Sequence, residues 1–142
     1  MYQGTFRHAL PSGLVNAWFP LPHDLHAPST ARGLLADRCG SLGEVEQDEL
    51  AVLASELVTN AVTHGRPDVT LHLVITSLLV RVDVFDHGLP IAPCVPVAAT
   101  TTQSTGRGLA IVDRLATRWG ANPPAGPRGK SVWFELDLAR VS

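Results

Sequence analysis

The sequence lacks the excess of basic residues that nucleic-acid binding requires. It carries 11 Lys and Arg residues against 13 Asp and Glu residues, which gives a formal net charge of -2 at pH 7. Because phosphate backbones are bound mainly through positive surfaces, we expect no direct nucleic-acid partner. Charged residues are sparse at 17%, whereas hydrophobic residues reach 45%. This composition is typical of a folded globular domain rather than a disordered chain.

Long hydrophobic runs and cysteines are also scarce. Residues 1–14 contain no apolar run of signal-peptide length, and the most apolar stretch, residues 69–85, is interrupted by charged residues such as Arg81. The two cysteines, Cys39 and Cys94, do not have a metal-binding spacing, and reduced thiols are the simplest interpretation. We therefore expect a cytoplasmic protein without a membrane-spanning segment.

The 142 residues suit a single domain with one core. Residues 1–13 show little pattern and are interpreted as an N-terminal tail, and residues 14–142 as the domain. Apolar periodicity predicts elements in the order β-α-α-β-β-loop-α-β, at about residues 14–21, 28–39, 44–65, 69–75, 80–86, 106–120 and 132–138. The short connection after residue 75 indicates an antiparallel hairpin. The predicted fold is therefore α+β, a two-layer sandwich with helices on one face of a mostly antiparallel sheet.

Residues 89–105 form the longest stretch without a recognisable period. Pro90, Pro93 and Pro96 lie in its first half, and small polar residues end it. Loops of this length inside compact domains are usually functional. We interpret this segment as a lid over a ligand, with a simple long connection as the alternative.

The longest predicted helix carries an acid and an amide on one side. Glu56 and Asn60 stand four residues apart, so they lie one turn above each other, away from the apolar stripe. Taken alone, a solvated polar face is the simpler explanation. An Asn oxygen, however, suits a hard cation such as Mg²⁺ beside phosphate oxygens, and a neighbouring Glu can polarise an attacking hydroxyl or water.

Two further groups of residues are weak signals individually. Asp86 and Gly88 end a strand whose alternation places Asp86 on the core side, where a carboxylate suits an exocyclic amine of a purine. Gly106-Arg107-Gly108 opens a predicted helix, and free N–H groups at a helix N-terminus favour an anion. The order and spacing of all three groups are much more specific than any one of them.

Together the three groups resemble the motifs of the GHKL, or Bergerat-fold, ATPases. The motifs are, in chain order, Glu56-x-x-x-Asn60-Ala61 with His64-Gly65 after it (the N box), Asp86-x-Gly88 (the first glycine box) and Gly106-x-Gly108-Leu109 (the second glycine box). The first glycine box departs from the family pattern at Pro90, where glycine is frequent. Within this superfamily, residues 14–138 most resemble the bacterial anti-sigma-factor serine kinases of the RsbW and SpoIIAB type.

The resemblance implies a protein serine/threonine kinase that uses ATP and Mg²⁺. Asn60 would coordinate the metal, and Asp86 would accept a hydrogen bond from the adenine amino group. Glu56 would be the general base for a partner's serine hydroxyl. Arg107 would either offset γ-phosphate charge during transfer, as a second catalytic residue, or simply clamp phosphate. The remaining implied nucleotide-binding residues are His64, Gly88, Thr105, Gly106, Gly108, Leu109 and Lys130.

His64 and Lys130 also have simpler interpretations. His64 is alternatively a brace for the end of its helix. Gly129-Lys130 resembles the tail of a P-loop, but Pro124 stands where a P-loop requires glycine, and a strand rather than a helix follows. Lys130 is therefore interpreted first as a turn residue, which could also touch phosphate.

The resemblance also implies partners. In this branch the phosphorylated serine lies on an anti-anti-sigma protein of the STAS type, and the kinase also sequesters a sigma factor, usually as a homodimer. The alternative function is a non-catalytic, ATP-dependent regulator that captures such a partner without phosphate transfer. The presence of Glu56 favours catalysis, because pure binding would tolerate its loss.

Overall fold

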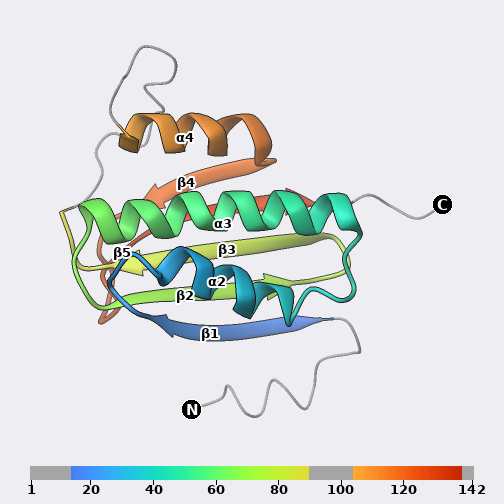
Figure 1. Cartoon of the computed structure of the whole chain (residues 1–142), viewed down its shortest axis with the longest axis horizontal. Coiled ribbons are helices and arrows are strands. Elements are labelled where there is room, and N and C mark those ends of the chain that lie inside the picture. The colour runs from blue at the N-terminus through green and yellow to red at the C-terminus, as the bar shows by residue number, and fades with distance from the viewer. Residues whose placement is uncertain (1–13, 90–103, 139–142) are drawn as a thin grey trace.

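The computed structural model describes residues 14–89 and 104–138. For residues 104–108 it describes the backbone but not the side chains. In chain order the elements are β1 (Val15–Leu21), α2 (Ala27–Ala36), α3 (Glu44–His64), β2 (Val69–Ile75), β3 (Leu79–Asp86), α4 (Ser104–Leu115), β4 (Arg118–Asn122) and β5 (Lys130–Asp137) (Figure 1). The expected N-terminal tail, and the expected lid apart from its two ends, lie outside the described residues.

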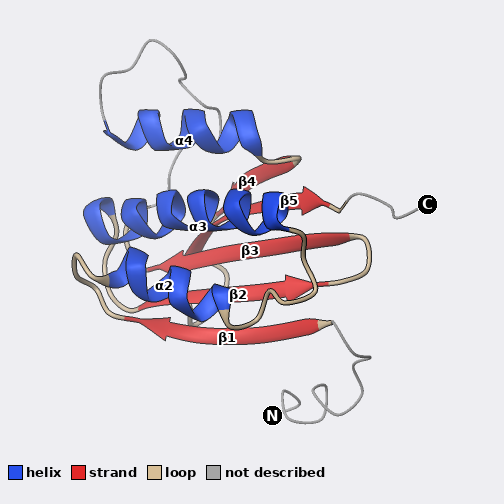
Figure 2. Cartoon of the chain, turned by 45° about the vertical axis from the view of Figure 1, so that its right-hand side comes forward, coloured by secondary structure: helices blue, strands red, loops and turns tan. Residues whose placement is uncertain are grey.

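The described strands form a five-stranded antiparallel sheet in the order β1-β2-β3-β5-β4. Helices α2 and α3 lie across one face of this sheet, and α4 lies on the same side near β4 (Figures 1 and 2). The expected hairpin is present as β2 and β3, with His72 opposite Asp83. The predicted two-layer α+β arrangement is thus confirmed.

Alternation along the strands explains which face the helices cover. In β2, Val69, Leu71, Leu73 and Ile75 are buried, whereas the residues between them are partly exposed. Because successive strand residues point to opposite faces, every second side chain packs against the helices. The helical side of the core comprises Ala27, Ala31 and Leu35 of α2, Leu50, Leu53, Ala54, Leu57, Val58 and Ala61 of α3, and Leu109 and Val112 of α4.

The sequence prediction was wrong about the segment after α4. A helix was expected to continue to Gly120, but α4 ends at Leu115, and residues 118–122 form β4. Pairing with β5 prevails over helix continuation: the backbone N–H of Thr117 donates to the Glu135 carbonyl oxygen at 2.8 Å. Leu115, the last residue of α4, is 39% exposed. The apolar residues Trp119 and Ala121 do pack against the same core, but they do so from a strand and not from a longer helix.

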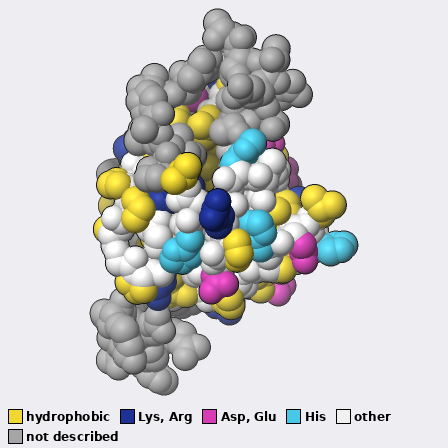
Figure 3. Space-filling view, turned by 90° about the vertical axis from the view of Figure 1, so that its left-hand side faces the viewer, with side chains coloured by type: hydrophobic (Ala, Val, Ile, Leu, Met, Phe, Trp, Pro, Cys, Tyr) yellow, Lys and Arg dark blue, Asp and Glu magenta, His cyan; other side chains and the backbone are white. Residues whose placement is uncertain are grey.

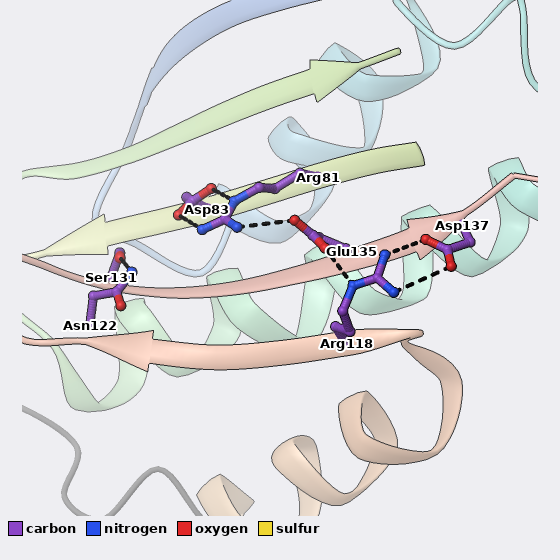
Figure 4. Close-up of polar contacts among 7 residues, drawn as sticks. All are labelled: Arg81, Asp83, Arg118, Asn122, Ser131, Glu135 and Asp137. Atoms are coloured by element: carbon purple, nitrogen blue, oxygen red, sulfur yellow. Dashed lines mark hydrogen bonds and ion pairs between the residues drawn. The ribbon is translucent and has the colours of Figure 1, made fainter. Parts of the chain in front are cut away.

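Among the described residues no helix lies on the other face of the sheet (Figures 1 and 2), and this uncovered face carries a ladder of ion pairs. Arg81 bonds both carboxylate oxygens of Asp83, at 2.8 and 3.1 Å, and reaches Glu135 at 3.1 Å (Figure 4). Glu135 also accepts from Arg118 at 2.7 Å, and Arg118 pairs in turn with Asp137. The hydrogen bond from Arg118, helped by that from Arg81, holds the pKa of the Glu135 carboxyl below its usual range.

Aromatic side chains flank this ladder on the same face. The rings of Trp18 and His72 stack with centroids 3.8 Å apart, and the Arg128 guanidinium lies 4.0 Å from the Trp18 ring. The His72 Nε2 atom lies 2.8 Å from Asn16 Oδ1. Arg81 similarly lies over the Trp133 ring at 4.2 Å. The face is therefore polar and paired rather than a bare apolar surface.

In the described part of the chain, no helix combines the length and apolarity that crossing a lipid bilayer requires. Cys39 is a free, buried thiol, and burial raises its pKa to about 11, so it stays protonated at neutral pH. Cys94 lies outside the described residues.

Candidate functional site

A pocket opens at the end of the molecule where α3 and β3 finish and β5 begins. Its walls come from these three elements and the residues after β3, and its volume is about 70 Å³. A single buried water needs roughly 10–15 Å³ on the same measure, so this is more than a packing defect. The lining residues are Leu57, Asn60, Ala61, His64, Val84, Asp86, Leu89, Lys130 and Val132. Figure 3 views the molecule from this end, where histidine and basic side chains gather among apolar ones.

Asp86 is the most buried polar residue of the pocket, with 2% of its surface exposed. The strand alternation predicts this burial, because Asp86 follows the buried Val80, Val82 and Val84 at intervals of two. Its Oδ1 atom accepts the backbone N–H of Gly88 at 2.6 Å and that of Arg66 at 3.4 Å. A buried carboxylate requires such donors, and the chain itself supplies them.

Lys130 provides the opposite charge at the same depth. Its Nζ atom lies 2.8 Å from Asp86 Oδ2, and 5% of the residue is exposed. The expectation that Lys130 is a turn residue was wrong: it is the first residue of β5, directly opposite Asp86 in the antiparallel ladder. Lys130 shares the inner face with Val132 and Phe134, so its side chain points towards the helices.

Glycines allow the backbone to close tightly around Asp86. A Cβ atom on Gly65 would lie 2.5 Å from both Asp86 Oδ1 and the Ala61 carbonyl oxygen. Gly129 has a φ angle of +88°, and a Cβ there would collide with the Asp86 carbonyl oxygen. The end of α3, the end of β3 and the start of β5 therefore meet around one carboxylate because side chains are absent at these positions.

Asn60 contributes an unpaired polar group from α3. Although its spacing predicts the polar side of the helix, the residue is only 8% exposed. Its Nδ2 atom is buried and has no hydrogen-bond partner among the described residues. Leaving a buried amide unsatisfied costs roughly 1–3 kcal/mol, so such a group needs an explanation. It lines the same pocket as Asp86 and Lys130, where a bound molecule would supply the missing partner.

Of the other predicted site residues, some line the pocket and others do not. His64 lines the pocket but is otherwise exposed, and Gly88 contacts Asp86 through its backbone. Glu56 lies half-buried on α3, one turn before Asn60, and is not part of the pocket lining. Leu109, on α4, is buried in the core. Thr105, Gly106, Arg107 and Gly108 lie in the first turns of α4, and their side chains are outside the described residues.

The apolar walls and the ion pair were missed from the sequence. Leu57 and Ala61 flank Asn60 on α3, and Val84 and Val132 lie two residues from Asp86 and Lys130, so all four look like ordinary core residues. One signal was available: Lys130 is the only lysine in the sequence, since the other ten basic residues are arginines. A residue type that occurs once draws attention to its position, but it does not by itself predict a buried ion pair.

The described residues contain no group of His, Cys, Asp and Glu side chains that could hold a metal ion by themselves. Mg²⁺ commonly takes most of its ligands from a bound phosphate and water, with one or two from the protein. Asn60 lines the pocket, and its side-chain oxygen is the type of ligand that this pattern requires. The donor set therefore suits a metal that arrives with a phosphorylated ligand.

Comparison with known proteins identifies relatives of this arrangement. Residues 21–136 match the family of histidine kinase-like ATPase domains. An uncharacterized protein of Streptomyces coelicolor is 36% identical over 69 residues, an alignment that covers 46% of this chain and 66% of that protein. The structure of the RsbU and RsbW domains of a Mycobacterium tuberculosis protein matches with a TM-score of 0.64 at 19% identity, over 89% of this chain and 32% of that one. The chain thus spans less than two thirds of each relative, and at 19% identity the structural likeness shows the fold alone.

Proposed function

Since the chain belongs to the histidine kinase-like ATPase domain family and has its Bergerat fold, we propose that it binds ATP with Mg²⁺ in the pocket between α3 and β3. We further propose that it acts as a serine protein kinase that regulates a sigma factor. One observation carries the binding proposal: a buried carboxylate, Asp86, and an unsatisfied buried amide, Asn60, face the same pocket.

The inner part of the pocket suits the base. Leu57 and Ala61 of α3 face Val84 and Val132 of the sheet, which gives apolar walls for the two faces of a flat ring. Asp86 lies at the floor, where it would accept a proton of the adenine 6-amino group. His64 lines the same pocket, and the backbone N–H of Gly88 donates to Asp86.

The phosphates would lie between Asn60 and the start of α4. The backbone N–H groups of the first turn of a helix have no intrahelical partner and attract anions. Thr105, Gly106, Arg107 and Gly108 occupy these first turns, and glycines there permit close approach of a phosphate. Asn60 would hold Mg²⁺ through its side-chain oxygen, and the bound metal would neutralise phosphate charge during transfer.

In the proposed reaction, Glu56 accepts the hydroxyl proton of a serine on the partner protein. The serine oxygen forms a bond to the γ-phosphorus as the bond between that phosphorus and the ADP oxygen breaks. Arg107 would offset the charge on the transferred phosphoryl group. The partner in this proposal is a STAS-type anti-anti-sigma protein, and a homodimer of the chain in the cytoplasm would also bind the sigma factor.

A non-catalytic role is the second candidate, and the position of Glu56 favours it. Glu56 is half-buried and does not line the pocket, unlike Asn60 one turn later. Glu56 can act as the base only if both the γ-phosphate and the partner's serine reach that side of α3. In this second reading the chain binds ATP and captures its partner without phosphate transfer.

Isothermal titration calorimetry with Mg-ATP tests the binding proposal. The unaltered protein should bind, and Asn60→Ala should weaken binding in the presence of Mg²⁺ by at least tenfold. Thr59→Ala, at an exposed neighbouring position on α3, is the matched control and should leave the affinity unchanged. Full affinity in Asn60→Ala would remove Asn60 from the site, and no binding by the unaltered protein would reject the proposal.

Phosphoserine formation on candidate anti-anti-sigma proteins separates the two roles. Glu56→Gln should abolish labelling while ATP binding persists, and Glu49→Gln, on the same helix, should not. Labelling that survives in Glu56→Gln would contradict the assignment of the base. Binding of ATP and partner without any labelling would select the non-catalytic role.

A further inference from the structure

The buried Asp86–Lys130 pair leaves hydrogen-bonding capacity directed at the pocket. A carboxylate has about four acceptor positions. Asp86 uses two of them on backbone N–H groups, those of Gly88 and Arg66, and one on Lys130. One acceptor position therefore remains, on the Oδ2 side that faces Lys130.

Lys130 is similarly incomplete. An ammonium group has three N–H donors and no acceptor. Among the described residues, the hydrogen bond recorded for Nζ is the one to Asp86, at 2.8 Å. With 5% of the residue exposed, water cannot solvate the remaining protons fully. The attraction within a buried charge pair offsets the free energy lost on desolvation only when the remaining donors are also hydrogen-bonded. We therefore expect a hydrogen-bond acceptor beside Lys130 when the pocket is filled.

We propose that this pair reads the base of the bound nucleotide, with Lys130 donating to the ring nitrogen N1 of adenine while Asp86 accepts from the adjacent 6-amino group. This inference rests on the proposed function. One remaining acceptor next to one donor complements the adenine edge, which offers one amine donor beside one ring acceptor. Guanine instead presents two donors, N1–H and the 2-amino group, to a carboxylate with a single position left. Lys130 is thereby a specificity residue for the base and not a phosphate ligand.

The affinity of the unaltered protein for base-modified nucleotides tests this directly. In 1-deaza-ATP a C–H group replaces N1, and the 6-amino group is kept. We expect it to bind on the order of 10- to 100-fold more weakly than ATP, the loss expected for a hydrogen bond to a charged group. In the matched probe 7-deaza-ATP, the altered atom lies on the other edge of the ring, and its affinity should equal that of ATP. GTP should bind more weakly than ATP.

Substitution of the lysine gives a second readout. Lys130→Met should bind ATP and 1-deaza-ATP equally, because the donor to N1 has been removed. Arg128→Met, which removes a cation from the outer face two residues earlier, should keep the discrimination. Circular dichroism establishes that each variant is folded, and if Lys130→Met is not, the probes on the unaltered protein decide alone.

The single lysine also permits a spectroscopic test without any variant. In protein labelled selectively at lysine, the side-chain signals belong to Lys130 alone. ATP should shift the ε-CH₂ resonance strongly, and saturating 1-deaza-ATP should shift it much less. Equal affinities and equal shifts for the two nucleotides would overturn the role of Lys130 while leaving ATP binding intact. Absence of ATP binding would instead reject the proposed function itself.

Discussion

Strands β3 and β5 hold two sets of ion pairs, one on each face of the sheet, and the two cross-strand pairs differ in how far water reaches them. On the uncovered face, Arg81 lies opposite Glu135, and its side chain is 31% exposed. On the helix-covered face, Lys130 lies opposite Asp86, and the two side chains are 7% and 3% exposed. The same strand register therefore places one pair where water reaches it and the other where it does not.

The difference indicates what each pair is for. Pairs that water can reach gain little free energy, typically up to about 1 kcal/mol, but also cost little to form. A buried pair loses several kcal/mol of hydration per charge, and an apolar pair of similar size is often equally stable there. The outer ladder links residues that lie opposite each other on β3, β5 and β4, and so favours this strand register. The inner pair is poorly explained by stability alone, and its position in the pocket accounts for it.

The largest effect should follow from breaking the inner pair on one side. Lys130→Met leaves Asp86 charged and buried, so the free energy of unfolding should fall by about 3–5 kcal/mol. Urea unfolding followed by circular dichroism measures the change. The double variant Asp86→Asn with Lys130→Met should recover most of that loss, since neither partner is then charged. A double variant as unstable as the single one would mean that shape, and not charge, dominates at this position.

The next largest effect should come from the glycines around Asp86. Gly65→Ala places a Cβ 2.5 Å from Asp86 Oδ1, and the carboxylate must move. Overpacking of this kind costs about 1–3 kcal/mol, and nucleotide binding should weaken together with stability. Gly40→Ala is the control, because no heavy atom lies within 4 Å of its added Cβ. Unchanged stability and unchanged ATP affinity in Gly65→Ala would show that the carboxylate is not held tightly.

Local patterns were sufficient to predict most of the fold. The period of two in β2 and β3, and the acidic start and glycine end of α3, set the ranges of these elements because each signal lies within its own segment. β4 was missed because its five residues pair with a strand eight residues further on. A short strand stabilised by its neighbour carries little information of its own.

In the candidate site, too, the features set by local patterns were predictable and those set by distant contacts were not. The burial of Asp86 was predictable from strand alternation, and the N-box helix from its apolar stripe. The contact of Asp86 with Lys130 was not, because β3 and β5 are separated by α4 and β4, and no local signal sets their register. The unpaired amide of Asn60 was equally hidden, since burial of one polar residue on a helix depends on what packs against it.

A smaller effect is expected from the outer ladder. Arg81→Met removes the bonds to Asp83 and Glu135; Arg81 and Glu135 are partly exposed, whereas Asp83 is buried. The free energy of unfolding should fall by about 1–2 kcal/mol, because the buried Asp83 loses its partner while the exposed part of the ladder contributes little, and this is below the loss from Lys130→Met. Calorimetric titration should give an unchanged ATP affinity, because the substitution lies on the face opposite the pocket. A loss equal to that of Lys130→Met would abolish the contrast between the two faces.

The smallest effect should be a pH dependence confined to the uncovered face. Burial, opposed by Asp83 and reinforced by Arg128 and Arg81, lowers the pKa of His72 from its usual 6.5. The unfolded chain therefore binds the proton more readily, and the stability that depends on neutral His72 is present above about pH 6.5 and lost as the pH falls towards the lowered pKa. His72→Gln should flatten this part of the pH–stability curve, measured by urea unfolding between pH 5 and 8. ATP affinity, measured over the same range, should show no step that His72→Gln removes, because His72 stacks on Trp18 on the face away from the pocket. A His72-dependent step in ATP affinity would instead couple the two faces.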